Sequence, residues 1–278
     1  MACFRLVLLL VASRRSDALQ PTVNKIVGQL GVGSGGGTTD VILSSGFCCF
    51  SSHCGFLDAL EASPLSIGAL VGTSSGSLAA SLYACGLSAE AVAAELAAKA
   101  PVRECRLSRT PWRGALSTRA LVKRLARVLP PRFEDLGVPL GVGVYDWRSG
   151  ATRLVTSGPL PEAVAASCAV PRLFSPVYLD GAGYLDGGGK DRTFLEPYRA
   201  WRPARPPPLV HLVKDRGVPL EPRDGVRDGD GDVRLLQTDR SATAKLWNLG
   251  AFAEERLAAA DAARAQLGAL YPEMMVSS

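Results

Sequence analysis

The stretch Gly72-Thr73-Ser74-Ser75-Gly76 decides the fold expected for this chain. An apolar run at residues 67–71 precedes it and a helix-like run at residues 77–84 follows it, so the pattern predicts a strand, a tight turn and a helix. G-x-S-x-G in that context is a nucleophile elbow, because Gly72 and Gly76 permit a sharp turn and close packing of strand against helix. The turn exposes the hydroxyl of Ser74. The helix starts at this serine, so its first N–H groups face any negative charge that forms there.

Segments on both sides of this turn alternate between strand and helix patterns. Residues 40–44 and 66–71 read as apolar strands, and a helix pattern at residues 51–61 lies between them. This order predicts a mainly parallel sheet with helices on its faces. Further elements are predicted along the chain: a helix capped by Ser88, a hairpin at 139–145 and 153–156, a helix at 162–170, short strands at 177–179 and 184–185, a strand at 209–213 and a helix at 242–270.

Composition limits the classes of partner. The 278 residues carry a net charge of +5, which suits an anionic membrane surface but does not require nucleic acid, so we expect no nucleic-acid partner. Seven cysteines without paired spacing predict no disulfide framework. Adjacent Cys48 and Cys49 do not match zinc spacing, and the Asp-rich loop at residues 224–232 has Val233 where a calcium loop needs glycine. We therefore expect no metal site.

Residues 1–18 have the pattern of a targeting segment. Their apolar core at residues 6–11 is flanked by arginines and is too short to cross a bilayer. The core resembles that of a signal peptide. Secretory and plastid-type routes both fit, and a buried strand or a tail on a soluble or membrane-peripheral protein is the alternative.

Residues 19–39 are interpreted as a glycine-rich linker. Its G-x-G-x-x-G run precedes a strand instead of following one, which argues against a dinucleotide site.

Residues 101–132 are strongly basic, with nine Lys and Arg side chains and Trp112. A helix pattern at residues 117–129 places Leu121, Leu125 and Val128 on one side. One interpretation is a surface for anionic lipid head groups, which makes peripheral membrane contact an expectation for this segment. The other is a solvated helix face docked on the core, which is the commoner role of charge runs.

A serine nucleophile requires a base, and the chain has only two histidines, His53 and His211. The order Ser74, Asp186, His211 matches that of α/β-hydrolase triads. His211, however, lies inside an apolar strand pattern and not on a loop after it, which is typical of a core residue. His53 follows the first loop in a helix pattern and is interpreted as structural. A base other than histidine is therefore the favoured hypothesis, and a triad that uses His211 is the alternative.

Five motifs together resemble the patatin-like phospholipase family across residues 41–195. In chain order they are Leu43-Ser44-Ser45-Gly46, Gly55-Phe56-Leu57-Asp58-Ala59-Leu60-Glu61, Gly72-Thr73-Ser74-Ser75-Gly76, Ala169-Val170-Pro171-Arg172-Leu173-Phe174-Ser175-Pro176-Val177 and Gly183-Tyr184-Leu185-Asp186-Gly187-Gly188. Each motif alone is weak, whereas the set in this order is specific. The resemblance implies an α/β three-layer fold, a mainly parallel central sheet with helices on both faces, and one acyl hydrolase domain at residues 40–278.

The resemblance also implies a Ser-Asp dyad in place of a triad. Carried over, Ser74 is the nucleophile and Asp186, followed by Gly187 and Gly188, is the base. The D-G-[GA] form also occurs at Asp180, but the family order of Pro-Val, short turn and Tyr-x-Asp-Gly-Gly places Asp180 in the turn. The implied function is hydrolysis of fatty-acyl esters of lipids through an acyl-enzyme. Its partner is a lipid ester, and it needs no metal or organic cofactor.

The chain departs from the family in the loop after the first strand. The family pattern is G-G-G-x-[KR]-G, whereas residues 45–50 read Ser-Gly-Phe-Cys-Cys-Phe, with one glycine and no Lys or Arg. Oxyanion holes act through backbone N–H groups, so we expect Gly46, Phe47 and Ser75 to supply the donors. The departure keeps open a second alternative, a catalytically weak relative that binds lipid or protein.

Overall fold

The computed structural model describes residues 38–99, 103, 105–215, 217–227, 229 and 231–272. The expected targeting segment at residues 1–18 and nearly all of the linker at 19–39 lie outside the described residues. The strands of the described part are β1 (Thr39–Leu43), β2 (Ile67–Thr73), β3 (Arg106–Leu107), β4 (Leu116–Ser117), β5 (Leu140–Asp146), β6 (Thr152–Val155), β7 (Val177–Leu179), β8 (Ala182–Asp186), β9 (Leu209–Val213) and β10 (Arg234–Thr238). Its α-helices are α3 (Phe50–Glu61), α4 (Ser75–Ala84), α5 (Ala89–Ala97), α6 (Arg119–Leu125), α7 (Leu160–Ser167), α8 (Leu195–Trp201) and α9 (Phe252–Leu270).

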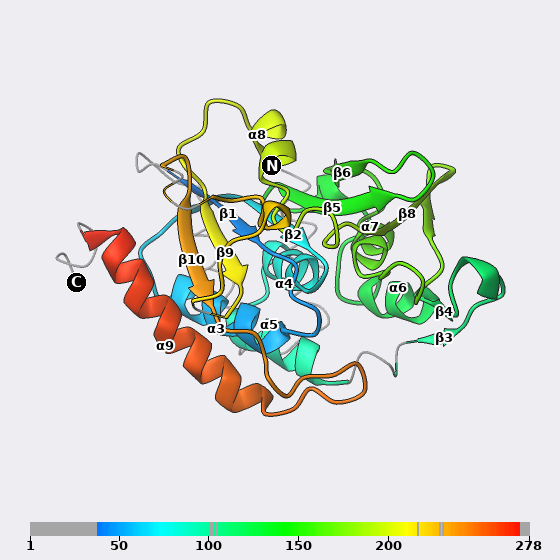
Figure 1. Cartoon of the computed structure of the whole chain (residues 1–278), viewed down its shortest axis with the longest axis horizontal. Helices are drawn as coiled ribbons and strands as arrows, with labels where there is room; N and C mark the ends of the chain where they lie inside the picture. The colour runs from blue at the N-terminus through cyan, green and yellow to red at the C-terminus, as the bar shows by residue number, and fades with distance from the viewer. Residues whose placement is uncertain are drawn as a thin grey trace.

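One mixed sheet organises the described residues. Its strand order is β10-β9-β1-β2-β5-β8-β7, with β6 paired to β5 at the side (Figure 1). The pairs from β10 to β5 are parallel, whereas β6, β7 and β8 pair antiparallel with their neighbours. The mainly parallel sheet and the β5–β6 hairpin predicted from the sequence are confirmed. Strands β3 and β4 form a separate small hairpin that projects at one end of the molecule.

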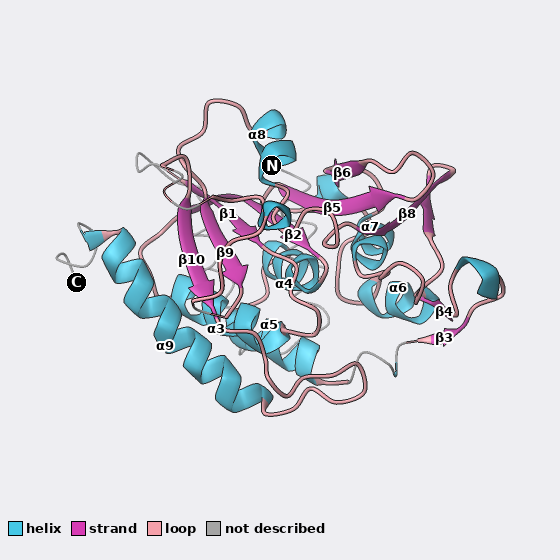
Figure 2. Ribbon diagram, in the orientation of Figure 1, coloured by secondary structure: helices cyan, strands magenta, loops and turns pink. Residues whose placement is uncertain are grey.

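Helices cover both faces of this sheet, as Figure 2 shows. Side chains alternate across a strand, and the core divides accordingly. Val41 and Leu43 of β1 belong to the larger apolar cluster, which also contains residues of α3, α4, α5 and α7. Ile42, between them, belongs to a smaller cluster with Leu195 and Tyr198 of α8. The expected three-layer fold is confirmed, and the carboxyl ends of β1 and β2 lie next to each other between the two helical layers.

The long helix predicted at residues 242–270 begins ten residues later than expected, at Phe252. Gly250 has a φ of +63°, a left-handed conformation that a helix interior does not contain. The preceding loop folds back onto the first turn of α9, where the hydroxyls of Ser241 and Thr243 donate to Glu255. The prediction was wrong there, because these polar side chains bind the helix end instead of extending the helix.

The basic helix predicted at residues 117–129 is shorter in the structure, where α6 ends at Leu125. Leu125 is buried, α6 packs against α7, and Arg124 forms an ion pair with Glu95 of α5. For α6, docking on the core is therefore the correct interpretation. Of the helices in the described part of the chain, none combines the length and apolar character needed to span a membrane.

Candidate active site

The serine of the elbow lies between the end of β2 and the start of α4. Ser74 has φ +54° and ψ −121°, a conformation that an L-residue rarely adopts and that surrounding structure must hold in place. A side chain on Gly76 would collide with the carbonyl oxygen of Leu43, and one on Gly72 would lie 2.5 Å from the carbonyl oxygen of Gly76. The two glycines thus allow the close strand–helix packing predicted for the elbow.

Hydrogen bonds from a second helix fix this turn. The N–H of Ser74 donates to the hydroxyl of Ser167 at 2.8 Å, and that hydroxyl donates to the carbonyl of Gly143 in β5 at 2.7 Å. The carbonyl of Ser74 accepts from the N–H and the hydroxyl of Ser77 at 2.9 and 2.7 Å. Ser167 was not among the site residues predicted from the sequence. The available signal was a lone hydroxyl at the end of an Ala-rich helix, since a buried hydroxyl needs partners.

Asp186 is the last residue of β8 and is buried beside Ser74. Its Oδ1 accepts the N–H of Gly188 at 2.8 Å, and its carboxylate lies close enough to the side chain of Ser74 to interact with it. Burial raises the pKa of Asp186 to about 6, and the interactions with Ser74 and Gly188 oppose that rise. Asp180 lies exposed in the turn between β7 and β8 with φ +48°, as predicted from the order of the family motifs. The structure therefore brings Ser74 and Asp186 together.

An apolar pocket opens beside Ser74. Phe47 and Phe50 both contribute to its wall. Phe50 is buried, whereas Phe47 is 49% exposed at the surface. The remaining apolar wall comes from α4, α5, α6 and four loops, through Cys48, Leu78, Leu82, Leu96, Cys105, Leu121, Leu125, Cys168, Val170, Phe174 and Leu246. A hydrocarbon chain fits such a lining.

The loop after β1 forms a tight turn despite its single glycine. The N–H of Cys49 donates to the carbonyl of Gly46 at 2.7 Å, and Cys48 adopts a φ of +58°. Among the described residues, no protein acceptor binds the N–H groups of Gly46, Phe47 or Ser75. The donors expected from the sequence are thus unengaged by the described part of the protein.

The two histidines form a buried chain that does not include Ser74. His53 Nε2 lies 3.2 Å from the hydroxyl of Ser75, and His53 Nδ1 lies 3.1 Å from His211 Nδ1. The other nitrogen of His211 lies 2.7 Å from Thr238 Oγ1, and Phe56 stacks on the ring. Burial lowers the pKa of His53 to about 3 and that of His211 well below its ordinary value. Both imidazoles are therefore neutral structural groups at pH 7.

Within the part of the chain that the structure describes, no group of three His, Cys, Asp or Glu side chains is placed to hold a metal ion. The six described cysteines are free. Burial raises the pKa of Cys48 and of Cys54 to about 12, so both are protonated thiols that pack as small apolar side chains.

Comparison with known proteins agrees with this geometry. The model of the patatin-like phospholipase family matches residues 41–197, more than half of the chain. The chain belongs to the patatin-like phospholipase family. VipD from Legionella pneumophila is a similar solved structure, with a TM-score of 0.52 and 12% sequence identity over 87% of this chain and 68% of VipD. That identity is low, so the likeness shows a shared fold alone. Membership of the family supports lipid acyl hydrolysis as the general activity.

Proposed function

We propose that the chain cleaves fatty-acyl esters with Ser74 as nucleophile and Asp186 as base. The observation that carries the proposal is the position of the buried Asp186 carboxylate, close enough to interact with the Ser74 side chain, beside an apolar pocket. A hydroxyl is a weak nucleophile until a neighbouring base takes its proton. A carboxylate whose pKa is about 6 is ionised at neutral pH yet more basic than an ordinary aspartate.

The reaction proceeds in two halves. Ser74 Oγ attacks the ester carbonyl carbon while its proton moves to Asp186, and the carbonyl oxygen becomes an oxyanion. The N–H groups of Gly46, Phe47 and Ser75 bind that charge, which the N-terminus of α4 also favours. The C–O bond then breaks, and the leaving alcohol takes the proton from Asp186. Water attacks the acyl-enzyme, gives a proton to Asp186 and releases the fatty acid, and the proton returns to Ser74.

The geometry favours this dyad over a triad. Both ring nitrogens of His211 lie at hydrogen-bond distance from other side chains, those of His53 and Thr238. The strand that carries His211 pairs with β1 and β10, inside the sheet. Asp186, by contrast, has a buried carboxylate close enough to Ser74 to interact with its side chain.

The lipid substrate is part of the proposal, and so is contact with an anionic membrane surface. In the β3–β4 hairpin, Leu107 is 85% exposed and Trp112 is 78% exposed. Three exposed arginines surround them in the sequence, namely Arg106, Arg109 and Arg113. Cys105 and Thr118, at the two ends of the same hairpin, line the pocket. Exposed apolar side chains among cations suit the interface of a bilayer with anionic lipid, and here they adjoin the pocket.

Release of fatty acid from phospholipid and galactolipid vesicles and from triacylglycerol emulsions tests the function. We expect Ser74→Ala and Asp186→Asn to lower the rate by at least about 10⁴-fold, as loss of a nucleophile or base does. A folded His211→Ala variant is expected to stay active. A fluorophosphonate probe is expected to label Ser74 of the wild-type chain. Failure of both labelling and hydrolysis would favour the binding-protein alternative, and loss of activity in folded His211→Ala would favour the triad.

A further inference from the structure

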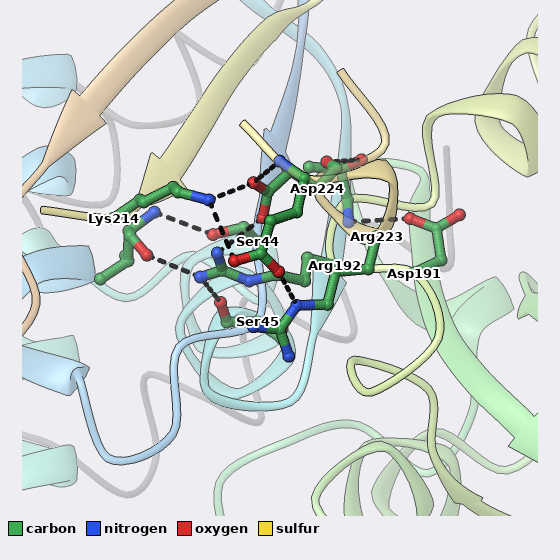
Figure 3. Close-up of polar contacts among 10 residues, drawn as sticks. Ser44, Ser45, Asp191, Arg192, Lys214, Arg223 and Asp224 are labelled. Carbon is green, nitrogen blue, oxygen red and sulfur yellow. Dashed lines mark hydrogen bonds and ion pairs between the residues drawn. The ribbon is translucent and has the colours of Figure 1, made fainter. Parts of the chain in front are cut away.

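A buried cation lies directly behind the loop after β1. Arg192 is only 5% exposed, and its guanidinium donates in three directions (Figure 3). The acceptors are the carbonyl of Ser45 at 2.8 Å, the carbonyl of Val213 at 2.6 Å and Oδ1 of Asp224 at 2.8 Å. One side chain thus joins the end of β1, the end of β9 and the loop that precedes β10.

Arg192 binds Ser45 through its main chain as well. The N–H of Ser45 donates to the carbonyl of Arg192 at 2.8 Å, so both backbone polar groups of Ser45 bind this one residue. The next residues are Gly46 and Phe47, the proposed oxyanion donors. Ser45 also lies against the turn after Asp186, because a side chain on Gly188 would collide with that of Ser45. The orientation of the Gly46 peptide therefore follows from the position of Arg192.

The buried part of the cluster around Arg192 holds two cations and one carboxylate. Lys214 Nζ donates to Oδ2 of Asp224 at 2.5 Å, and Lys214 and Asp224 are both buried. Two buried cations thus share one buried carboxylate, while Glu221 lies 3.9 Å from Lys214 and is half-exposed. Burial is the largest cause of the lowered pKa of His53, and the positive charge of Arg192 is the second. The electric field of Arg192 therefore reaches His53, whose ring contacts the hydroxyl of Ser75.

We propose that Arg192 is a positioning residue of the oxyanion hole, holding the peptides of Ser45, Gly46 and Phe47 and adding positive charge behind them. The inference rests on the proposed function. Residues 45–50 contain no Lys or Arg of their own, so a cation from elsewhere in the chain supplies the charge. A planar guanidinium binds acceptors in several fixed directions, whereas an ammonium acts as a point charge. The role therefore requires arginine.

A merely structural ion pair provides the matched control. Arg256 of α9 donates to both carboxylate oxygens of Asp58 at 2.7 Å and to Glu90, and it is mostly buried. It joins α9 to α3 and α5 and does not line the pocket beside Ser74. Arg256→Met thus removes a comparable set of contacts without touching the loop after β1.

The test compares Arg192→Met, Arg192→Lys and Arg256→Met in the full chain. Four quantities are measured: kcat and KM for a soluble short-chain ester, the rate at which a fluorophosphonate labels Ser74, and Tm. We expect Arg192→Met to lower kcat and the labelling rate by about 100-fold, the scale of a lost or displaced oxyanion donor, with KM nearly unchanged. Arg192→Lys should lower kcat about tenfold, because lysine keeps the positive charge but lacks the planar set of N–H donors. Arg256→Met should lower Tm alone.

The outcomes separate the positioning role from the function itself. A folded Arg192→Lys with wild-type kcat and wild-type labelling would overturn the inference and leave the proposed function standing. If Arg192→Met does not fold, Arg192→Lys and Asp224→Asn, which weakens the anchor of Arg192, carry the test with the same readouts. A wild-type chain that neither hydrolyses esters nor reacts with the probe would overturn both proposals.

Discussion

The N–H of Ser74 donates to the hydroxyl of Ser167 at 2.8 Å, and the same hydroxyl donates to the carbonyl of Gly143. One buried hydroxyl therefore ties the strained turn after β2 to both β5 and the end of α7. Because the N–H of Ser74 is used in this way, it is not a donor for an oxyanion, and the N–H of Ser75 takes that role in the proposed mechanism.

Ser167→Ala should weaken both stability and catalysis. It leaves the buried N–H of Ser74 without its partner, which costs about 1–3 kcal/mol of unfolding free energy. We also expect kcat to fall about tenfold, because a displacement of the reacting group costs rate. Urea unfolding and steady-state kinetics measure the two effects. Ser77→Ala is the control, since the carbonyl of Ser74 keeps its bond to the N–H of Ser77. Equal effects in both variants would contradict the prediction.

The pH dependence of kcat/KM should report Asp186. A base must be deprotonated, and the pKa of Asp186 is raised to about 6, so kcat/KM should fall about tenfold per pH unit below pH 6 and level off above pH 7. The two histidines do not titrate in this range, because burial keeps their pKa values far lower. The same profile is therefore expected for His211→Ala. If kcat/KM instead fell only near pH 4, the carboxylate of Asp186 would not be desolvated in solution.

The raised pKa of Asp186 also predicts a pH-dependent stability. The folded chain holds the Asp186 proton more tightly than the unfolded chain, so the resulting stabilisation is complete below about pH 4 and lost as the pH rises through 6. Asp186→Asn has no proton to lose at this position, so its stability does not fall as the pH rises through 6. Its unfolding free energy relative to wild type should grow by about 3 kcal/mol between pH 3.5 and pH 8. Denaturant titrations at both pH values measure the difference, and a constant difference would count against burial of the charge.

Leu121→Trp should shorten the acyl chain that the pocket accepts. Leu121 of α6 is half-buried in the pocket wall, so an indole there fills space that a long chain would occupy. We expect kcat/KM for a twelve-carbon ester to fall about tenfold or more relative to a four-carbon ester, the scale of discrimination by an apolar pocket. Leu257→Trp is the control, because Leu257 is an exposed residue of α9 outside the pocket. An unchanged ratio in Leu121→Trp would argue that the acyl chain binds elsewhere.

Removing the exposed apolar pair Leu107 and Trp112 should weaken membrane binding. The double variant Leu107→Ser, Trp112→Ala is expected to bind phosphatidylserine vesicles at least about tenfold more weakly, from lost burial of apolar surface. Added salt should weaken binding of the wild type, since the arginines attract the lipid charge. Activity on a soluble ester should stay the same. Vesicle sedimentation measures binding. If neither the substitutions nor added salt changed vesicle binding, the β3–β4 hairpin would not be the membrane-binding surface.

Local patterns predicted most of the fold because they depend on near neighbours. The elbow at residues 72–76 follows from glycine spacing, and the β5–β6 hairpin follows from alternating side chains around Gly150. The pairing of β1 with β9 could not be read in this way, because the partners are far apart in the chain. Without that pairing, nothing in the sequence places His211 against His53.

The missed site residues share the same cause. Arg192 stands in a charged segment after Gly188 with no motif of its own, and its role depends on acceptors at Ser45, Val213 and Asp224. Ser167 looks like an ordinary helix residue until its contact with Ser74 is known. The proposed dyad residues stand in turns marked by glycine spacing, whereas positioning residues are marked only by contacts across the fold.

The close approach of His53 to His211 has a consequence for acid stability. At 3.1 Å the two Nδ1 atoms cannot both carry protons, so one ring donates and the other accepts, and the rings are opposite tautomers. The unfolded chain gains a proton on each histidine below about pH 6.5, whereas the folded chain keeps both rings neutral far below that pH. Acid therefore destabilises the folded chain through two neutral rings that are buried where α3 packs on β9.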